Sequence, residues 1–428
     1  MKENYLLKTK NAERLYREYA ADLPLIDFHN HISVYDIHTN RKFESITELW
    51  LDPDPYKHRL MRICGVDEYF ITGNATPYEK FQKYCDIFPY LAGSPVYDWS
   101  KMELSSVFGI NERICSNSAK RIFDSTGEML ASSDFSVLGI LSKFNIEYQS
   151  PVASIEDDLS LFTDTKVAPS LRADSLLSAD EKTVRHIEKM SKIKITDEKS
   201  YIAALRPVFD KFSEKGCKFV DHSLDSEFFD TSDKIKTKRL EALAKEYAQR
   251  GWTLLLHLDA NRETSKRLEN LAGKAGGFAA SGGRLDIMKL SNILRNMEMS
   301  GLPDTVLFPL NINDQAPLAI LQGSFTQSGV LSKVQLGPAW WWCDHKMGIL
   351  NTLSSISSFG LLSGFIGMTT DSRSILSFVR HDYFRRILAS FLDEENERND
   401  MELSDKDFEI LIKRICYENA KSKINGRG

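Results

Sequence analysis

Two histidines one residue apart, His29 and His31, follow the apolar stretch Leu25–Phe28 near the N-terminus. Successive side chains of an extended chain point to opposite faces, so both imidazoles project the same way and Asn30 projects the other way. Neutral imidazole suits zinc, iron, nickel or copper, and two imidazoles at a strand end form half of a metal site. By itself, such a histidine pair is more often exposed or hydrogen-bonded than bound to a metal. It indicates a metal site only when other candidate ligands lie close to it.

Other residues that could do chemistry follow later apolar stretches of the chain. They are, in chain order, Arg172, Asp221, His222, His257, Trp340, Asp371 and Arg373. Each also has a purely structural interpretation. Asp371 before a helix is a good N-cap, Arg172 could be a surface charge, and His257 could be a core histidine. At least one of the three consecutive tryptophans that begin at Trp340 must serve packing.

Eight short apolar stretches must position these residues, and most are followed by a helical pattern. They are Leu25–Phe28, Ile146–Val152, Lys166–Ser170, Lys218–Asp221, Thr253–Leu258, Thr305–Leu310, Val334–Leu336 and Phe365–Met368. Continuous apolar stretches suit parallel strands covered on both faces, and their alternation with helices implies right-handed βαβ units. Eight such units predict a (β/α)8 TIM-type barrel, whose active site gathers at the C-terminal ends of the strands.

The rest of the chain is predicted to be mainly helical. Residues 8–22 have helical spacing, and residues 36–142 are charged, rich in aromatics and without a convincing strand. We expect one barrel domain over residues 1–428, with residues 36–142 as a helical insertion after the first strand. The amphipathic stretch Asp405–Ala420 should form a helix outside the barrel.

Composition narrows the class of protein. The 428 residues are 42% hydrophobic and 27% charged, which is typical of a globular chain with ample core material. The net charge of -5 argues against nucleic acid or an anionic membrane as the main partner. We find no secretory signal and no apolar run of membrane-spanning length. The six cysteines contain no Cys-x-x-Cys pair and predict reduced thiols in a cytoplasmic protein.

His-x-His on the first strand with Asp371 on the eighth resembles the amidohydrolase superfamily. Longer stretches resemble one branch of it, the uronate (glucuronate) isomerases, and they occur in order along nearly the whole chain. These stretches are Thr47–Trp50, Tyr56–Arg62, Gly65–Gly73, Tyr78–Phe81, Ala339–Trp341, Gly367–Ser374 and Arg380–Leu388. The chain departs from the family at Gln149–Ser154, where the family carries Thr-Thr-Asp-Asp-Pro, and beside Arg172 and His257. These departures concern the pocket wall and the substrate preference.

The resemblance implies an aldose–ketose isomerase that moves a proton from C2 to C1 through a cis-enediol. The substrates would be D-glucuronate, giving D-fructuronate, and D-galacturonate, giving D-tagaturonate. A homo-oligomer with a small hexuronate as its ligand is expected. The implied catalytic residues are Tyr56, Asp371, Arg373 and His31; the substrate-binding residues are Arg172, Asp221, His257 and Trp340; and His29, His31 and Asp371 would hold one divalent ion, with zinc preferred.

Chemistry supports two of these assignments. The planar guanidinium of Arg172 can make paired hydrogen bonds to a carboxylate. The pKa of Tyr56, ordinarily about 10, is too high for a good base, so Tyr56 needs a cation beside it, and the resemblance offers Arg373. The structural alternative is a core tyrosine and a charge at the start of a helix.

Two other functions remain open at this stage. A metal-dependent hydrolase would usually place a histidine after the sixth strand, where this chain has Phe308–Asn311. A catalytically inactive uronate-binding relative is compatible with the departure at Gln149–Ser154, but the candidate catalytic residues argue against it.

Overall fold

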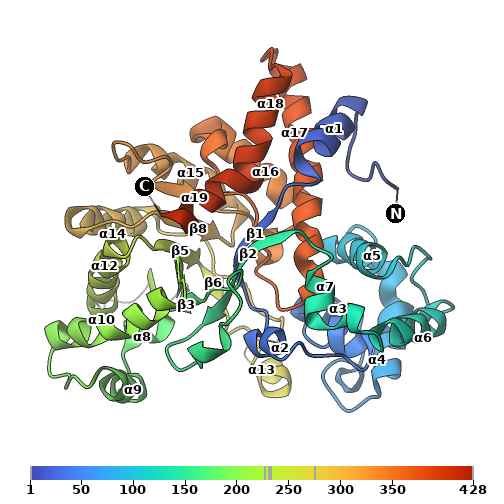
Figure 1. Cartoon of the computed structure of the whole chain (residues 1–428), viewed down its shortest axis with the longest axis horizontal. Helices are drawn as coiled ribbons and strands as arrows, with labels where there is room; N and C mark the ends of the chain where they lie inside the picture. Colours follow the sequence, from blue (N-terminus) through green and yellow to red (C-terminus); the bar gives the residue numbers. More distant parts are fainter. Residues whose placement is uncertain (1, 226–227, 230–233, 274–275, 427–428) are drawn as a thin grey trace.

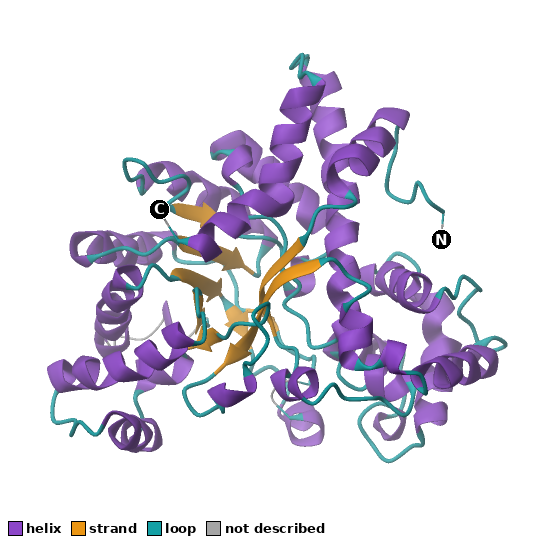
Figure 2. Cartoon of the chain, viewed as in Figure 1, coloured by secondary structure: helices purple, strands orange, loops and turns teal. Residues whose placement is uncertain are grey.

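Seven parallel strands form a curled sheet at the centre of the molecule, and helices surround it (Figures 1 and 2). The computed structural model describes residues 2–225, 228–229, 234–273 and 276–426. The strands, in their order across the sheet, are β1 (Leu25–Asn30), β2 (Ile146–Ala153), β3 (Ser170–Arg172), β4 (Phe219–Leu224), β5 (Thr253–Leu258), β8 (Thr305–Pro309) and β9 (Val334–Leu336).

The burial of these strands explains their apolar sequences. Every residue of β1, β5 and β8 is buried, as expected for parallel strands covered on both faces. Phe28 of β1 contacts Phe219 of β4 with 5.5 Å between ring centroids, although β2 and β3 lie between these strands in the sheet. The sheet is therefore curved enough to bring its strands around a common core.

Seven of the eight predicted strands are present, two of them (Thr253–Leu258 and Val334–Leu336) with the predicted ends and five with shifted ends. The main shift is at the third, predicted at Lys166–Ser170, where β3 covers Ser170–Arg172 and Val167 makes only an isolated bridge to Gln149. Short apolar stretches identify a strand better than they identify its ends, because flanking residues pair only where a neighbouring strand runs beside them.

The predicted eighth strand, Phe365–Met368, is wrong. These residues are described but form no strand, and β9 is the last member of the sheet. Gly367 has φ +88°, and a Cβ there would lie 2.1 Å from the carbonyl oxygen of Ile415. On the other side the amide of Ile366 donates to the Gln335 side chain at 2.9 Å instead of to a strand backbone. The close approach of the C-terminal helices bends this segment away from strand geometry.

Residues 369–372 nevertheless lie along β1, and we call this contact the β1 seam. The amide of Asp371 donates to the carbonyl of His29 at 3.1 Å, and the amide of His31 donates to the carbonyl of Ser372 at 2.9 Å. The Thr369 hydroxyl lies 2.9 Å from the amide nitrogen of His29 and accepts its hydrogen bond. The seam thus joins the two ends of the chain in place of a regular eighth strand.

The buried carboxylate of Asp27 holds the β1 seam together. It accepts hydrogen bonds from the Thr369 hydroxyl at 2.9 Å and from the amide and hydroxyl of Thr370 at 2.6 and 2.8 Å. Asn30 donates at 2.8 Å, and the imidazole of His381 lies 3.2 Å away. Burial alone would raise the pKa of Asp27. These partners outweigh the effect of burial and hold the pKa below its ordinary value.

The chain between β1 and β2 is helical, without a strand. It contains α2 (Val34–His38), α3 (Pro55–Ile63), α4 (Pro77–Ile87), α5 (Pro95–Phe108), α6 (Ala119–Leu130) and α7 (Val137–Leu141). Figure 1 shows α3 to α7 gathered on one side of the sheet, at the lower right. α3 begins at a proline and is capped by Asp54, whose carboxylate accepts from the amides of Tyr56 at 2.9 Å and Lys57 at 3.2 Å.

The remaining helices pack outside the sheet. They are α1 (Lys10–Leu15), α8 (Asp174–Ser178), α9 (Glu181–Ser191), α10 (Glu198–Glu214), α12 (Lys234–Gln249), α13 (Lys266–Ala272), α14 (Ile287–Ser300), α15 (Gln315–Ser324), α16 (Lys346–Phe359), α17 (Val379–Asn399), α18 (Asp405–Lys413) and α19 (Asn419–Asn425). Turns of π-helix extend α1 through Ala20 and join α18 to α19, so helices occupy both predicted terminal stretches. Among the described helices, none has the length and hydropathy needed to cross a membrane.

A two-stranded hairpin lies beyond β5. It pairs β6 (Ala260–Asn261) with β7 (Ala280–Ser281), antiparallel. The segment before β7 contacts α3, because Arg59 donates to the carbonyls of Gly277 at 3.4 Å and Ala279 at 3.3 Å. This contact links the hairpin to the helix that carries Tyr56.

Candidate active site

A cavity of about 290 Å³ is lined by residues from the C-terminal parts of the strands, from α3 and from the hairpin. This volume suits one small molecule better than a polymer. Its walls include all nine residues that the sequence predicts for the site: His29, His31, Tyr56, Arg172, Asp221, His257, Trp340, Asp371 and Arg373. Residues from both ends of the chain therefore share one pocket.

His29, His31 and Asp371 form a compact group at the β1 seam. Nε2 of His29 and Nε2 of His31 lie 3.5 and 3.1 Å from Oδ1 of Asp371. Their ligand atoms lie within 4.8 Å of one another. Asp371 has φ +44°, a left-handed conformation that is uncommon outside glycine and that occurs at functional sites. The seam hydrogen bonds hold its backbone in this conformation.

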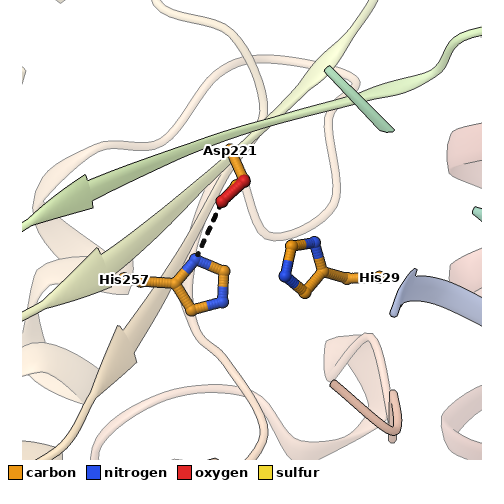
Figure 3. A group of neighbouring side chains, drawn as sticks. All are labelled: His29, Asp221 and His257. Atoms are coloured by element: carbon orange, nitrogen blue, oxygen red, sulfur yellow. Dashed lines mark ion pairs between the residues drawn. The ribbon is translucent and has the colours of Figure 1, made fainter. Parts of the chain in front are cut away.

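Asp221 and His257 approach His29 from β4 and β5 (Figure 3). Nδ1 of His257 lies 3.8 Å from Oδ2 of Asp221, and the rings of His257 and His29 are 4.7 Å apart. Burial lowers the pKa of His257 to about 3, so this imidazole is neutral. The three residues form a second group whose ligand atoms lie within 4.8 Å, and His29 belongs to both groups.

The donor set fits a divalent metal ion. Four buried polar atoms in the two groups have no hydrogen-bond partner among the described residues: Nδ1 of His29, Oδ1 of Asp221, Nε2 of His257 and Oδ2 of Asp371. Buried polar atoms are normally satisfied, so these four atoms fit a site that binds an ion or a polar ligand. Imidazole and carboxylate donors without thiolates suit zinc and similar ions.

Arg172 closes β3 and reaches the cavity with its side chain 31% exposed. Its Nε lies 3.1 Å from Oδ2 of Asp174, whose other oxygen accepts from the amide of Ser223 at 2.6 Å. The negative charge of Asp221 raises the pKa of Arg172 above its ordinary value, so the guanidinium stays charged. The side chain is thus fixed at one edge and charged, as carboxylate binding requires.

Tyr56 enters the cavity from the first turn of α3 and is 9% exposed. Its ring makes edge contacts with Trp99 and Trp342, each with 5.8 Å between centroids. Burial raises the pKa of Tyr56 above its ordinary value, and the nearby guanidinium of Arg380 opposes this. Arg373 lines the same cavity, and burial lowers its pKa.

Arg380 and Asp344 adjoin the site, and the sequence did not identify them as site residues. Arg380 of α17 lies over the Tyr56 ring, with Cζ 4.9 Å from the centroid, and its Nη1 lies 3.3 Å from Oδ2 of Asp344. Arg380 does begin one of the stretches that resemble uronate isomerases. It follows no strand, however, so the barrel argument gave no reason to place it near the cavity.

The tryptophans differ in environment. Trp340 contacts His257 with 4.7 Å between centroids, and its neighbours lie under two guanidinium groups, Trp341 under Arg262 at 4.7 Å and Trp342 under Arg59 at 4.1 Å. Arg262 also lines the cavity and was missed, because the hairpin that carries it left no clear pattern in the sequence.

His222 follows Asp221 on β4 but is not among the residues that line the cavity. Its Nε2 lies 3.1 Å from the Tyr247 hydroxyl, and burial lowers its pKa to about 4. Neighbouring residues on a strand point to opposite faces, so His222 meets the helices outside the sheet while Asp221 faces the cavity.

Known proteins match this chain over nearly its whole length. A family model described as glucuronate isomerase matches residues 1–239 and 230–423. A uronate isomerase of Caldanaerobacter subterraneus is 36% identical, and the match covers 98% of each chain. One from Oceanobacillus iheyensis is 33% identical, over 98% of this chain and 97% of the relative.

Solved structures agree with this result. The crystal structure of a uronate isomerase from Thermotoga maritima has a TM-score of 0.89 at 26% identity and covers 99% of each chain. A glucuronate isomerase from Caulobacter crescentus has the same fold, with a TM-score of 0.89 at 23% identity, over 99% of this chain and 97% of that one. The extent and identity of these matches, together with the cavity just described, show that the chain belongs to the uronate isomerase family.

Proposed function

We propose that the chain interconverts D-glucuronate and D-fructuronate, and D-galacturonate and D-tagaturonate, as an aldose–ketose isomerase. The observation that carries this proposal is the meeting of Arg172, Tyr56 and Asp371 in one small cavity. A hexuronate presents a carboxylate at one end and a carbonyl at the other, and this cavity offers a charged fork for the first and proton-transfer groups for the second.

Substrate binding and ring opening come first. Arg172 binds the carboxylate of the sugar with paired hydrogen bonds, and Asp221, His257 and Trp340 contact the hydroxyl-bearing chain. Asp371 takes the proton of the C1 hydroxyl and delivers it to the ring oxygen as the bond between C1 and that oxygen breaks and the aldehyde forms, with His31 beside it at 3.1 Å. The opened substrate then lies with C1 and C2 between Tyr56 and the β1 seam.

Proton transfer between C2 and C1 follows. The phenolate of Tyr56 takes the proton from C2, the C2 hydroxyl passes its proton to the C1 oxygen, and the reaction goes through a cis-enediol in its ionised form. Tyr56 then returns its proton to C1, and the C2 oxygen becomes the ketone. Arg373 stabilises both the phenolate and the oxyanion character of the enediol.

The ion completes the site. We propose one divalent ion, zinc, held by His29, His31 and Asp371, whose ligand atoms lie within 4.8 Å of one another. A bound ion would act as a Lewis acid on the hydroxyl or carbonyl oxygens near C1 and C2, or on the carboxylate. We further propose that residues 1–428 form a single TIM-type barrel domain, in which the β1 seam stands in place of the eighth strand, with a helical insertion at residues 36–142, and that the protein is a cytoplasmic homo-oligomer. All six cysteines are free thiols, in keeping with a reducing compartment.

A coupled assay tests the reaction. D-glucuronate with a fructuronate reductase and its nicotinamide cofactor should give turnover that D-glucose does not support, and no turnover with any hexuronate would contradict the proposal. Turnover in D₂O should place deuterium at C1 of the ketose. Complete retention of the substrate's C2 hydrogen would instead indicate a hydride shift without a role for Tyr56.

Substitution of Tyr56 tests its role directly. Tyr56→Phe should lower kcat by at least about 10²-fold, the scale of a lost general acid–base group, with an unchanged circular dichroism spectrum. A kcat close to that of the wild type would remove Tyr56 from the chemistry.

A further inference from the structure

A buried ion pair lies behind Tyr56, outside the cavity lining. The Arg380 side chain is 1% exposed and that of Asp344 is 3% exposed. A buried ion pair is weak evidence for stability, because removing two charges from water costs about as much as their attraction returns. Its position therefore calls for another explanation.

The guanidinium of Arg380 lies between two parts of the proposed proton-transfer machinery. Cζ lies 4.9 Å from the ring centroid of Tyr56, and Nη1 donates to the carbonyl of Thr370 at 3.2 Å. Thr370 directly precedes Asp371 and is anchored by Asp27 at the β1 seam. One side chain thus contacts both the phenol and the backbone that carries Asp371.

The contacts of Arg380 leave part of its hydrogen-bonding capacity unused. Its Nε and Nη2 have no hydrogen-bond partner among the described residues, and neither has Oδ1 of Asp344. The guanidinium also stacks on Trp99, with Cζ 3.9 Å from that centroid. A fully satisfied structural ion pair would use these groups, so the geometry favours contact with the aromatic ring over hydrogen bonding.

We propose that Arg380, held by Asp344, is a positioning residue that favours the phenolate form of Tyr56 and fixes the phenol relative to Asp371. The inference rests on the proposed role of Tyr56. Tyr56 would then act with two cations: Arg373, which lines the same cavity, and Arg380, which lies on the buried side of the ring.

The charges around Tyr56 explain why a second cation is needed. Burial raises the pKa of Tyr56, and the carboxylates of Asp371, Asp344 and Asp54 raise it further, while Arg380 acts in the opposite direction. A phenol in that environment would ionise too rarely to act as a base without a compensating positive charge.

The test compares Arg380→Lys with a charge-balanced double variant, Arg380→Met with Asp344→Asn. The double variant leaves no unpaired buried charge, so it should fold where Arg380→Met alone could fail. Asp344 raises the pKa of Tyr56 and is neutralised together with Arg380, so we expect kcat of the double variant to fall by about tenfold. KM should change by less than about threefold, because the effect concerns proton transfer rather than binding. Arg380→Lys keeps both charges of the pair, and its kcat should stay within about threefold of the wild type.

A second experiment separates the proposed electrostatic role of Arg380 from a purely structural one by making the phenol at position 56 more acidic. Replacing Tyr56 with 3,5-difluorotyrosine lowers the intrinsic pKa of the phenol, so the loss of Arg380 should cost markedly less kcat in that background. Equal losses in both backgrounds, or a folded double variant with kcat within about threefold of the wild type, would overturn the inference.

Arg385 provides a matched control on the same helix. It is buried to 4% exposure and donates to the carbonyls of Leu23 and Pro24, outside the cavity. Arg385→Met should lower the melting temperature without a comparable fall in kcat. If Tyr56→Phe itself leaves kcat unchanged, the proposed role of Tyr56 fails; if only the double variant does so, the present inference alone fails.

Discussion

Arg172 is the residue whose assignment follows most directly from its chemistry. It stays charged beside Asp221, is held at one edge by Asp174 and reaches the cavity from the end of β3. Its proposed partner, the substrate carboxylate, exists in hexuronates and is absent from neutral sugars.

Arg172→Met should therefore lower kcat/KM for glucuronate by about 10²-fold, mainly through KM, as expected for a lost charged hydrogen-bond pair. Steady-state kinetics with glucuronate and with its neutral parent aldose provide the measurement. The residual rate on the aldose should change little. An equal loss on both substrates would assign Arg172 to the chemistry or to the scaffold.

The sequence predicted the residues that line the cavity well, but it did not predict the residues that lie behind them, Arg380 and Asp344. Six of the nine predicted residues belong to or follow strands that the structure contains. Tyr56 was predicted from the family resemblance alone, and Asp371 and Arg373 follow the predicted eighth strand, which does not form. Arg380 and Asp344 lie on a helix and a loop, and their contacts depend on how α17 packs against α3. No local pattern in the sequence contains that packing.

The link between α3 and the hairpin depends on one glycine. Gly277 has φ +82°, and a Cβ there would lie 2.3 Å from the carbonyl oxygen of Pro55, the first residue of α3. No side chain fits between the two segments, so their close approach fixes where α3 begins and hence where Tyr56 lies.

Gly277→Ala should displace the start of α3 and lower both kcat and the melting temperature. Gly251→Ala is the matched control, because Gly251 has φ +67° with nothing within 4 Å of the added Cβ. The control isolates the cost of the left-handed conformation, about 1 kcal/mol. Equal kcat values in the two variants would show that the contact with Pro55 does not position Tyr56.

The β1 seam gives a second prediction at this scale. The pKa of Asp27 is lower in the folded protein than in the unfolded chain, so its contribution to stability is present above a pH of about 4 and is lost as the pH falls further. Asp27→Asn places an amide donor against the amide of Thr370 and should cost about 3 kcal/mol at neutral pH.

Urea midpoints of wild type and Asp27→Asn at pH 7, 5 and 3.5 provide the measurement. The difference between the two proteins should shrink at the lowest pH. Asp393→Asn, which removes a similarly buried carboxylate near α1, should lower the midpoint without lowering kcat. A difference that does not change with pH would mean that the charge of Asp27 is not what holds the seam.

The eighth strand, which was predicted but does not form, shows a limit of prediction from local sequence patterns. Phe365–Met368 has the composition of a strand, and its neighbours do carry site residues beside β1. Its geometry is set by the C-terminal helices that pack against Gly367, a contact between segments almost 50 residues apart that a local apolar pattern does not reveal. Helices between β1 and β2 were easier to predict, because caps and prolines mark their starts.

At the scale of the whole molecule, the proposed ion should stabilise the fold, because its ligands come together only in the folded state. Saturation at 100 times Kd stabilises by about 2.7 kcal/mol, which corresponds to about 3 °C in the melting temperature of a chain of this size. Calorimetry at one scan rate, with zinc or with a chelator, measures the shift. His31→Ala should abolish it, and an unchanged shift in that variant would place the ion elsewhere.

The β1 seam also determines when the site can form during synthesis. Thr369 follows His29 by 340 residues, so at ordinary rates of protein synthesis roughly 20 to 70 s separate the emergence of the two histidines from that of Asp371. A nascent chain in that interval carries exposed histidines without their carboxylate and without the segment that lies along β1. Tight binding of the proposed ion is therefore an event of the nearly finished chain, after all seven strands of the sheet have been synthesised.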